Sequence, residues 1–327
     1  MFEKLFKIIF SNKILLPFYH HVSEKQPIHT KHLFKSRNIS HFRSDLDYFL
    51  KHYNPVSVDD IYRSIFKNYK LPQNPFLLSF DDGFSEVESI VAPILKEKGL
   101  PAIFFLNGDF IDNKDMMFRC KASILIEINN ISPILREQLD TIKDLFQSFD
   151  LEYTNFKDSV KSISYNKKDL LDKLLEVGEF DIESYLKNKK PYLTTDQILS
   201  LKKDGFDFGS HSMDHPYYGK ISEDKQIEQT LNSLEKVQNI VNSKLKLFSF
   251  PFSEEGVRES FYEKISPYLD LTFGTFDNKF DPIKFSLQRF AMEDYGDRIS
   301  TTEESVKSFY KRSILRIPFG KSSVKRV

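Results

Sequence analysis

Two adjacent carboxylates follow an apolar stretch that is typical of a β-strand. Residues 77–85 read LLSFDDGFS, so Asp81 and Asp82 come directly after four residues with strand character. Taken alone, DDG is most often a turn in which the carboxylates bond nearby backbone N–H groups. Successive side chains at a strand end point to opposite sides, so one carboxylate could bind an ion while its neighbour takes a proton from water. The pair is the first candidate for chemistry.

Two histidines form the second candidate. His211 and His215 stand four residues apart in the sequence FGSHSMDHP. Pro216 disfavours helical geometry at His215, so a loop at a strand end is the expected setting. An HxxxH pair in a loop is usually incidental, but two imidazoles with one carboxylate are a ligand set for a catalytic zinc or similar divalent ion. The conjunction with the aspartate pair therefore favours a metal site.

The segments that must position these residues alternate between helix and strand patterns. An amphipathic helix, a glycine and a short apolar strand occur in that order before PAIFFL and again before FDFG. The predicted strands are 14–19, 77–80, 102–106, 206–209, 247–250, 271–274 and 287–290. Such alternation predicts parallel strands wrapped by helices, as a barrel or a doubly wound sheet. In either fold, residues just past the carboxyl ends of the strands line the site.

The stretch from about 112 to 190 interrupts this alternation. It is rich in Lys, Asp, Glu and Asn and has helical patches such as KASILIEI and LLDKLLEV, without a good strand. Its apolar face looks narrow, so we expect a helical insertion rather than an independent domain. The prediction is one domain over 1–327, with this insertion over or beside the site and a basic tail at about 307–327.

Composition excludes several classes of protein. The chain has 327 residues, of which 40% are hydrophobic and 14% aromatic, so it can bury a substantial core and is not disordered. Its 47 basic and 47 acidic residues balance, so no overall field indicates a nucleic-acid partner. The single cysteine, Cys120, excludes an internal disulfide and suits a reducing cytosol.

The two chain ends raise the question of a membrane. The N-terminal sequence MFEKLFKIIF is interrupted by charges, which predicts no signal peptide and instead a short amphipathic helix with Phe2, Leu5, Phe6 and Ile9 on one face. The tail from Lys307 has seven Lys or Arg and no acid. We expect a cytoplasmic protein, with peripheral contact to the inner membrane surface or a lipid-linked glycan left open. The oligomeric state is also left open.

Three motifs carry a resemblance to a known family. SFDDG, SHSMDHP and FSFPFSEEG, in this order, resemble the first three motifs of the polysaccharide deacetylases, the NodB-homology group of carbohydrate esterase family 4. The resemblance implies an α/β fold of the distorted (β/α)₇ barrel type. It also implies that the protein hydrolyses N-acetyl groups on sugars. It implies Asp81 as general base and Asp82, His211 and His215 as metal ligands. Zinc is the first expectation, with Co²⁺, Ni²⁺ or Fe²⁺ able to fit the same ligands.

The later motifs depart from the common family pattern. The third motif, which would supply the oxyanion site at Pro251 and Phe252, lacks the arginine that often begins it and steadies the base, here Asp81. Arg289 is our candidate for that arginine. The fifth motif usually ends in a histidine that protonates the leaving amine, but the corresponding strand here reads LQRFAMED. The branch that deacetylates poly-N-acetylglucosamine starts with a Tyr-His segment similar to LPFYHHV, which implies His20 as the acid, with His21 as the fallback.

These expectations combine into one predicted function with named alternatives. The chain is predicted to be a metal-dependent hydrolase that releases acetate from an N-acetylated amino sugar or polysaccharide precursor, such as a nucleotide-linked or lipid-linked one. One alternative is an O-acetyl esterase on the same barrel. Another is a catalytically inactive carbohydrate-binding homologue, since motifs three to five are altered. A membrane-associated interaction protein is a weaker alternative.

Overall fold

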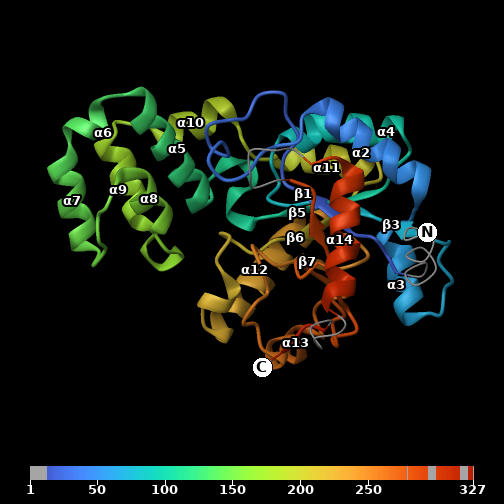
Figure 1. Ribbon diagram of the computed structural model, residues 1–327. Helices are drawn as coiled ribbons and strands as arrows, with labels where there is room; N and C mark the ends of the chain where they lie inside the picture. Colours follow the sequence, from blue (N-terminus) through green and yellow to red (C-terminus); the bar gives the residue numbers. More distant parts are fainter. Residues whose placement is uncertain (1–12, 278, 294–299, 317–322, 327) are drawn as a thin grey trace.

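Short parallel strands form the centre of the molecule (Figure 1). The computed structural model describes residues 13–277, 279–293, 300–316 and 323–326. The central strands are β1 (Pro17–Tyr19), β4 (Leu78–Phe80), β5 (Ala102–Leu106), β6 (Asp207–Ser210), β7 (Leu247–Ser249), β8 (Leu271–Gly274), β9 (Ser286–Gln288) and β10 (Phe290–Ala291). Within the described residues they lie in the order β10-β1-β4-β5-β6-β7-β8-β9, and each adjacent pair is parallel.

The last strand segment closes the sheet into a barrel. Its first half, β9, pairs with β8, and its second half, β10, pairs with β1. Arg289 is the residue between the two halves. Counting 286–291 as one bent segment, the described strands of the central sheet correspond one for one to the seven predicted from the sequence. The predicted α/β fold, a nearly closed parallel barrel with helices, is confirmed.

The sequences of the central strands are continuous apolar runs because both faces of the sheet are buried. Leu78, Phe80 and Phe104 pack outward in a cluster with the surrounding helices, whereas Leu77 and Phe105 belong to a second cluster on the opposite face. Successive side chains of a strand alternate between faces, so a single strand contributes to both clusters.

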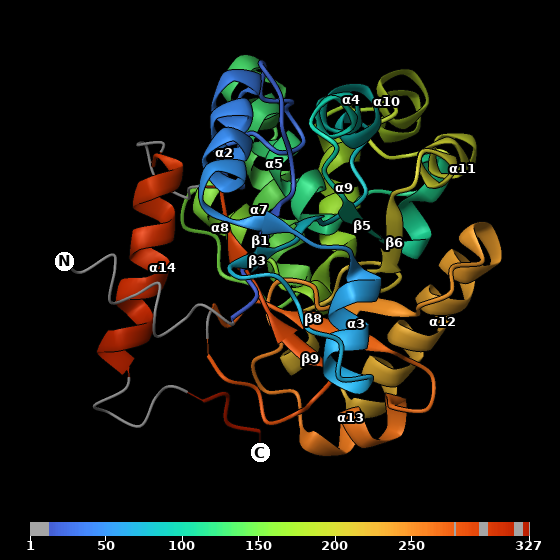
Figure 2. The ribbon, with the colours of Figure 1, turned by 90° about the vertical axis from the view of Figure 1, so that its right-hand side faces the viewer.

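Helices surround the barrel (Figure 2). They are α2 (Ile39–His52), α3 (Val58–Phe66), η1 (Val87–Val91), α4 (Ala92–Glu97), α11 (Thr195–Lys203), η4 (Tyr218–Lys220), α12 (Glu223–Val241), α13 (Glu259–Ile265) and α14 (Thr302–Arg316), with a small parallel pair, β2 (Asn54–Pro55) and β3 (Pro75–Phe76), beside them. Thr194 caps α11 in a capping box with Gln197. Gly99 and Gly205 follow α4 and α11 at positive φ, as expected for glycines that end helices.

The segment 108–189, between β5 and α11, is largely helical and extends away from the barrel (Figure 1). It contains η2 (Gly108–Asn113), α5 (Phe118–Ile131), α6 (Ile134–Glu137), α7 (Leu139–Ser148), α8 (Phe156–Ser162), η3 (Tyr165–Lys167), α9 (Asp169–Val177) and α10 (Ile182–Lys189). The expected narrow apolar face is wrong for α5, which is buried along most of its length. Helices α8 and α9 pack on α5, and the shared apolar cluster continues to Phe84 and Tyr192.

The chain ends are described only in part. The amphipathic helix expected at Phe2–Ile9 lies outside the described residues. The basic segment 307–327 begins inside α14, where Phe309 packs on Phe290 of β10, and its residues 317–322 and 327 also lie outside the described part. Among the described residues, no helix is long and apolar enough to cross a membrane.

Candidate functional site

The aspartate pair lies where β4 ends. The backbone N–H of Asp81 still donates to the Tyr19 carbonyl oxygen of β1, at 2.8 Å, so Asp81 continues the strand ladder. Asp82 has φ +70° and Gly83 has φ +67°, so the chain turns sharply at the second aspartate. Asp tolerates this left-handed conformation better than most residues. The turn therefore aims the two adjacent carboxylates in different directions.

The histidine pair lies on a loop after β6, as expected from Pro216. Ser212 and His215 both have positive φ, at +69° and +62°. The Ser212 hydroxyl accepts a hydrogen bond from the His215 backbone N–H at 3.0 Å, and the amide oxygen of Gln229 accepts one from the Met213 N–H at 2.9 Å. These bonds hold the loop in a tight conformation that brings both imidazoles to the same side.

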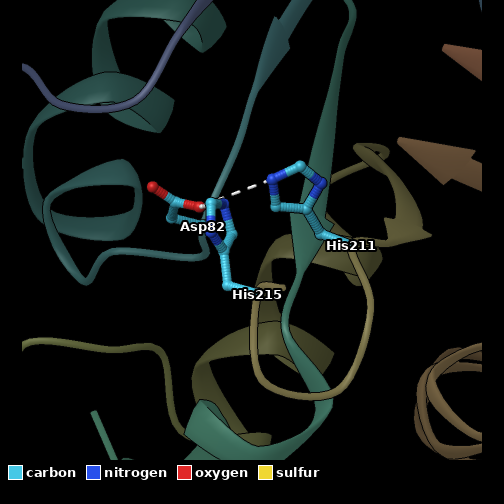
Figure 3. Close-up of side chains that lie close together, drawn as sticks. All are labelled: Asp82, His211 and His215. Atoms are coloured by element: carbon cyan, nitrogen blue, oxygen red, sulfur yellow. Dashed lines mark ion pairs between the residues drawn. The ribbon is translucent and has the colours of Figure 1, made fainter. Parts of the chain in front are cut away.

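Asp82, His211 and His215 converge on one point (Figure 3). Asp82 Oδ1 lies 3.1 Å from His215 Nε2 and 3.5 Å from His211 Nε2. One ligand atom from each of the three residues lies within 4.8 Å of the other two, and all three residues are buried. Within the described residues no other group of this kind occurs.

The donor atoms of this group fit a divalent metal ion. The Ser249 carbonyl oxygen lies 2.8 Å from His211 Nδ1 and can only accept, so Nδ1 carries a proton and Nε2 is the ring nitrogen directed toward Asp82. Burial on its own would raise the pKa of Asp82, but His215 and His211 beside it hold that pKa well below its usual range. An ionised carboxylate and two ring nitrogens that gather on one point are a ligand set for a cation. The group could therefore hold a divalent metal ion, of a kind that these ligands do not specify.

Asp81 is paired with Arg289 instead of with the histidines. The guanidinium donates two parallel hydrogen bonds to the carboxylate, Nη1 to Oδ1 at 2.7 Å and Nη2 to Oδ2 at 2.8 Å. Asp81 Oδ2 also lies 3.9 Å from His211 Nε2, which is beyond a hydrogen bond. Burial favours a raised pKa for Asp81, but the charge of Arg289 outweighs it and lowers the pKa. Asp81 is thus a buried, ionised carboxylate beside the group formed by Asp82, His211 and His215.

Arg289 reaches Asp81 through the interior of the barrel. Its guanidinium donates to Ser79 Oγ at 2.9 Å and also to Ser249 Oγ. The charge lies over the rings of Phe18 and Phe105, at 4.5 Å and 5.2 Å from their centroids. The arginine is fully buried, and the break between β9 and β10 is the point at which the chain turns this side chain inward.

His20 lies at the end of β1 and is paired with a carboxylate. Its Nδ1 lies 3.3 Å from Glu293 Oε2, and Glu293 Oε1 accepts from the backbone N–H groups of both His20 and His21. The imidazole stacks on Phe34 and is 16% exposed. Burial favours a lowered pKa, but the Glu293 carboxylate outweighs it and raises the pKa of His20 to about 9. His20 is therefore an imidazolium at neutral pH.

His21, the fallback acid, points elsewhere. Its Nδ1 lies 2.7 Å from Ser36 Oγ and its Nε2 lies 3.1 Å from Glu86 Oε1, so both ring nitrogens face other partners. It is buried and does not line the cavity described next.

A cavity of about 390 Å³ opens over Asp82, His211 and His215. Its wall includes Asp81, Asp82, His211, His215 and His20. The remaining lining residues are mostly aromatic or basic: Phe18, His32, Leu33, Phe34, Met117, Arg119, Lys161, Tyr217, Phe250, Phe252 and Thr275. The cavity gives a substrate access to the carboxylates and to the imidazolium together.

The third motif forms one edge of this cavity. Phe252 has φ +54°, which is unusual for a bulky residue, and its ring packs edge-on against His215 at 4.3 Å and stacks on Tyr217 at 3.8 Å. Among the described residues, no acceptor pairs with the Phe252 backbone N–H. Pro251 has no N–H to donate and does not line the cavity.

Sequence reasoning missed the residues that support the site. Glu293 stands in the quoted LQRFAMED segment, just past the predicted strand 287–290, and its position after a strand end was the one signal that could have identified it. Ser79 and Ser249 bind Arg289 from inside β4 and β7, where a serine in an apolar run gives only a weak signal. Arg119 and Lys161 come from the 112–190 segment, and their sequence neighbours gave no indication of the cavity.

Comparison with known structures gives the same fold at low sequence identity. The Streptococcus pyogenes deacetylase PplD, solved in complex with acetate, has a TM-score of 0.58 at 14% identity over 91% of this chain and 99% of its own. IcaB from Ammonifex degensii has a TM-score of 0.56 at 13% identity, covering 91% and 97%. A de-N-acetylase from Aggregatibacter actinomycetemcomitans has a TM-score of 0.55 at 15% identity, covering 90% and 99%.

Sequence comparison identifies the family. A search of curated proteins finds no match. The family described as polysaccharide deacetylase matches residues 68–264, which is more than half of the chain and includes the aspartate pair, the histidine pair and the third motif. The resemblance seen in SFDDG, SHSMDHP and FSFPFSEEG is thereby confirmed, and the chain belongs to the polysaccharide deacetylase family.

Proposed function

We propose that this protein is a metal-dependent carbohydrate N-deacetylase that releases acetate from an N-acetylated amino sugar. The observation that carries the proposal is the arrangement around one cavity of three kinds of group: a metal-binding triad, an ionised carboxylate and a protonated histidine. An amide resists hydrolysis because its carbonyl is a poor electrophile and its nitrogen leaves badly unless protonated. The three kinds of group address these two difficulties.

The triad Asp82, His211 and His215 would hold the metal, with zinc as the first choice. A divalent cation there supplies Lewis-acid chemistry, which polarises the amide carbonyl and makes the attacking water more acidic. The Ser249 carbonyl fixes the His211 tautomer, so the ring is oriented before any ion arrives.

Asp81 would take the proton of the attacking water. It is ionised at neutral pH because Arg289 lowers its pKa, and the two parallel hydrogen bonds fix the orientation of its carboxylate. A carboxylate with so low a pKa is a weak base, so it can act only on a water that is already acidified. Arg289 is a positioning residue in this scheme and does not touch the substrate.

The oxyanion that develops on the carbonyl needs a donor. The backbone N–H of Phe252 is proposed for this role, since its ring borders His215 and no described acceptor occupies the N–H. Pro251 is not proposed to contact substrate; its fixed φ shapes the turn that presents Phe252.

His20 would protonate the departing nitrogen. Its pKa of about 9 keeps it charged at neutral pH. Glu293 raises that pKa, contacts ring Nδ1 through Oε2, and is itself held through Oε1 by the backbone N–H groups of His20 and His21. A positioned general acid is worth about 10²–10⁴ in rate. Because an ester's alkoxide leaves with less help than an amine, a charged acid at this place favours the N-acetyl substrate over the O-acetyl alternative.

The walls of the cavity suit a sugar. Phe34, Tyr217 and Phe252 present ring surfaces, which pack against the apolar faces of pyranose rings, beside polar groups that can reach hydroxyls. The similarity in fold to a protein named as a de-N-acetylase agrees with this substrate class.

Acetate release tests the proposed function. Zinc-loaded protein is incubated with N-acetylated and O-acetylated sugars as monosaccharides, oligomers and nucleotide sugars, and acetate is quantified. We expect release from N-acetylated sugars. Tight metal binding without release from any acetylated sugar would favour the inactive carbohydrate-binding alternative, and release from O-acetylated sugars alone would favour the esterase.

A further inference from the structure

One wall of the catalytic cavity does not come from the barrel. Met117 and Arg119 lie at the start of α5 and Lys161 lies near the end of α8, and all three line the cavity beside the residues from the strand ends. The helices α5 and α8 pack together, so they present these side chains as one surface. We call Arg119 and Lys161 the basic pair.

Arg119 is held in place by neutral partners. Its Nη1 donates to the Lys161 carbonyl oxygen at 2.7 Å, and its Nη2 lies 3.4 Å from the Tyr217 hydroxyl. The guanidinium lies over the rings of Phe118 at 4.7 Å and Tyr217 at 5.6 Å. None of these contacts neutralises the charge, so the arginine is ordered but its positive charge remains available.

Neither member of the basic pair has a carboxylate partner. In the part of the chain that the structure describes, no acidic group lies within ion-pair distance of Arg119 or Lys161. Nearby lysines of the same helical segment differ: Lys121 pairs with Asp115 and Asp172, and Lys168 pairs with Asp214. Of these four cations, the two without a carboxylate partner are the ones that border the cavity.

The basic pair lies some distance from the reacting atoms. A series of ring contacts connects them: Arg119 lies over Tyr217, Tyr217 stacks on Phe252, and Phe252 touches the ligand His215. A group bound by the basic pair would therefore be a neighbouring part of the substrate and not the acetyl group. The acids that line the cavity, Asp81 and Asp82, belong to the catalytic centre.

We propose that Arg119 and Lys161 bind an anionic group, a phosphate ester or a carboxylate, on the part of the substrate next to the N-acetylated sugar. A planar guanidinium and an ammonium, both without a carboxylate partner, are suited to anionic oxygens. The basic pair selects charged over neutral glycans. Deacetylation of such a substrate rests on the proposed function, but anion binding does not.

Kinetics with matched substrates test this selection. Acetate release by the zinc-loaded protein is compared for N-acetylglucosamine 1-phosphate, a disaccharide of N-acetylglucosamine with glucuronic acid, and the neutral N-acetylglucosamine disaccharide. We expect Arg119→Gln and Lys161→Gln each to raise KM for one of the charged substrates about tenfold, as for loss of one charge-assisted hydrogen bond, with kcat unchanged. Turnover of the neutral substrate should stay within about twofold.

Control variants separate charge in the cavity from charge elsewhere. Arg136→Gln removes an exposed arginine that also donates to a backbone carbonyl, and Lys173→Gln removes an exposed lysine of α9; neither residue lines the cavity. Both controls should leave KM unchanged. Arg119→Lys should recover part of the affinity lost in Arg119→Gln. Which charged substrate responds identifies the anion as phosphate or carboxylate.

Binding without turnover makes the inference independent of the proposed function. Calorimetry measures glucosamine 1-phosphate, the glucosamine–glucuronic acid disaccharide and the neutral glucosamine disaccharide, each at low and high salt. We expect one charged ligand to bind more tightly than the neutral one, in a salt-sensitive way that the double variant Arg119→Gln/Lys161→Gln abolishes. Equal binding of charged and neutral ligands, or equal loss for all of them in the double variant, would overturn the inference even if acetate is released.

Discussion

The two walls of the cavity over Asp82, His211 and His215 are built on different principles. On the barrel wall, Asp81 and Asp82 are almost fully buried, as is Arg289 behind them, and opposite charges or imidazoles surround each carboxylate. On the insertion wall, Arg119 and Lys161 are solvent-accessible and contact only neutral groups or none. Both walls face the same cavity of about 390 Å³.

We infer from this difference that the barrel wall carries out the proposed chemistry, whereas the insertion wall selects the substrate. A buried charge is tolerable only while its partner is present, so the barrel wall cannot change without loss of stability or activity. An exposed charge without a carboxylate partner can change at little cost to folding. We therefore expect large effects of substitutions on the barrel wall, in stability and rate, and small, substrate-dependent effects on the insertion wall.

The largest effect on stability is expected for Arg289→Met. It leaves the buried Asp81 carboxylate unpaired, and breaking a buried pair in this way costs about 3–5 kcal/mol. The double variant Arg289→Met/Asp81→Asn should recover part of that loss, because no unpaired charge remains. Chemical denaturation measures the free energies of unfolding, with Arg43→Met as the control: the Arg43–Glu97 pair is 41% and 58% exposed, so solvent screens it and its loss should change stability far less.

The cost of Arg289→Met should also depend on pH. The folded-state pKa of Asp81 is lowered by Arg289, so the stabilisation is present above the unfolded-state pKa of about 4 and is lost as the pH falls through the folded-state value. The stability difference between wild type and variant should therefore shrink in acid. A difference that is constant from neutral to acidic pH would mean that the pair does not stabilise the fold electrostatically.

The second effect, on rate, is expected for His20→Ala. Loss of the acid should lower kcat/KM for an N-acetyl substrate by about 10²–10⁴ and lower it less for the matching O-acetyl substrate, because an alkoxide leaves with less help. His21→Ala is the matched control, since His21 faces Ser36 and Glu86 and should not alter the ratio of the two activities. Equal losses on amide and ester would show that His20 is not a leaving-group acid.

A smaller and more specific effect is expected for Glu293→Gln. In the proposed mechanism the acid is protonated His20, so activity should fall as the pH rises through the His20 pKa of about 9. Removing the charge of Glu293 lowers that pKa, so the alkaline limb of kcat/KM should move to lower pH while activity near pH 6 is less affected. If the alkaline limb of kcat/KM stays at the same pH in Glu293→Gln, the group that titrates there is not His20.

The smallest effects belong to the insertion wall. Arg119→Gln removes a partly exposed side chain bonded to neutral partners, so it should change the free energy of unfolding by no more than about 1 kcal/mol. Its pH profile on a neutral substrate should match that of the wild type. A large loss of stability would mean that Arg119 serves mainly to join α5 to α8 through the Lys161 carbonyl.

The barrel wall could be predicted from the sequence because its residues follow strands. Parallel strands place their carboxyl ends at one edge, so Asp82, after β4, and His211, after β6, had to approach each other once those strands were recognised. The position of Pro216 also predicted a loop at His215. The bend at Arg289 gave no such signal, and its pairing with Asp81 was only a hypothesis from the family resemblance.

The insertion wall could not be predicted, because its position depends on tertiary packing. Arg119 and Lys161 are ordinary surface residues by sequence, and they meet only because α8 packs on α5. The polar composition of 112–190 also concealed how deeply α5 is buried. Glu293 was missed for a related reason: it acts through the backbone and ring of His20, some 270 residues away in sequence.

The division of labour between the adjacent aspartates is the central claim, and metal content measured together with acetate release tests it most directly. Wild type, Asp81→Asn and Asp82→Asn are loaded with zinc, dialysed, and assayed on the same N-acetylated sugar. We predict that Asp81→Asn keeps the metal but releases no acetate, whereas Asp82→Asn loses both. Loss of the metal in Asp81→Asn, with its retention in Asp82→Asn, would contradict the assignment.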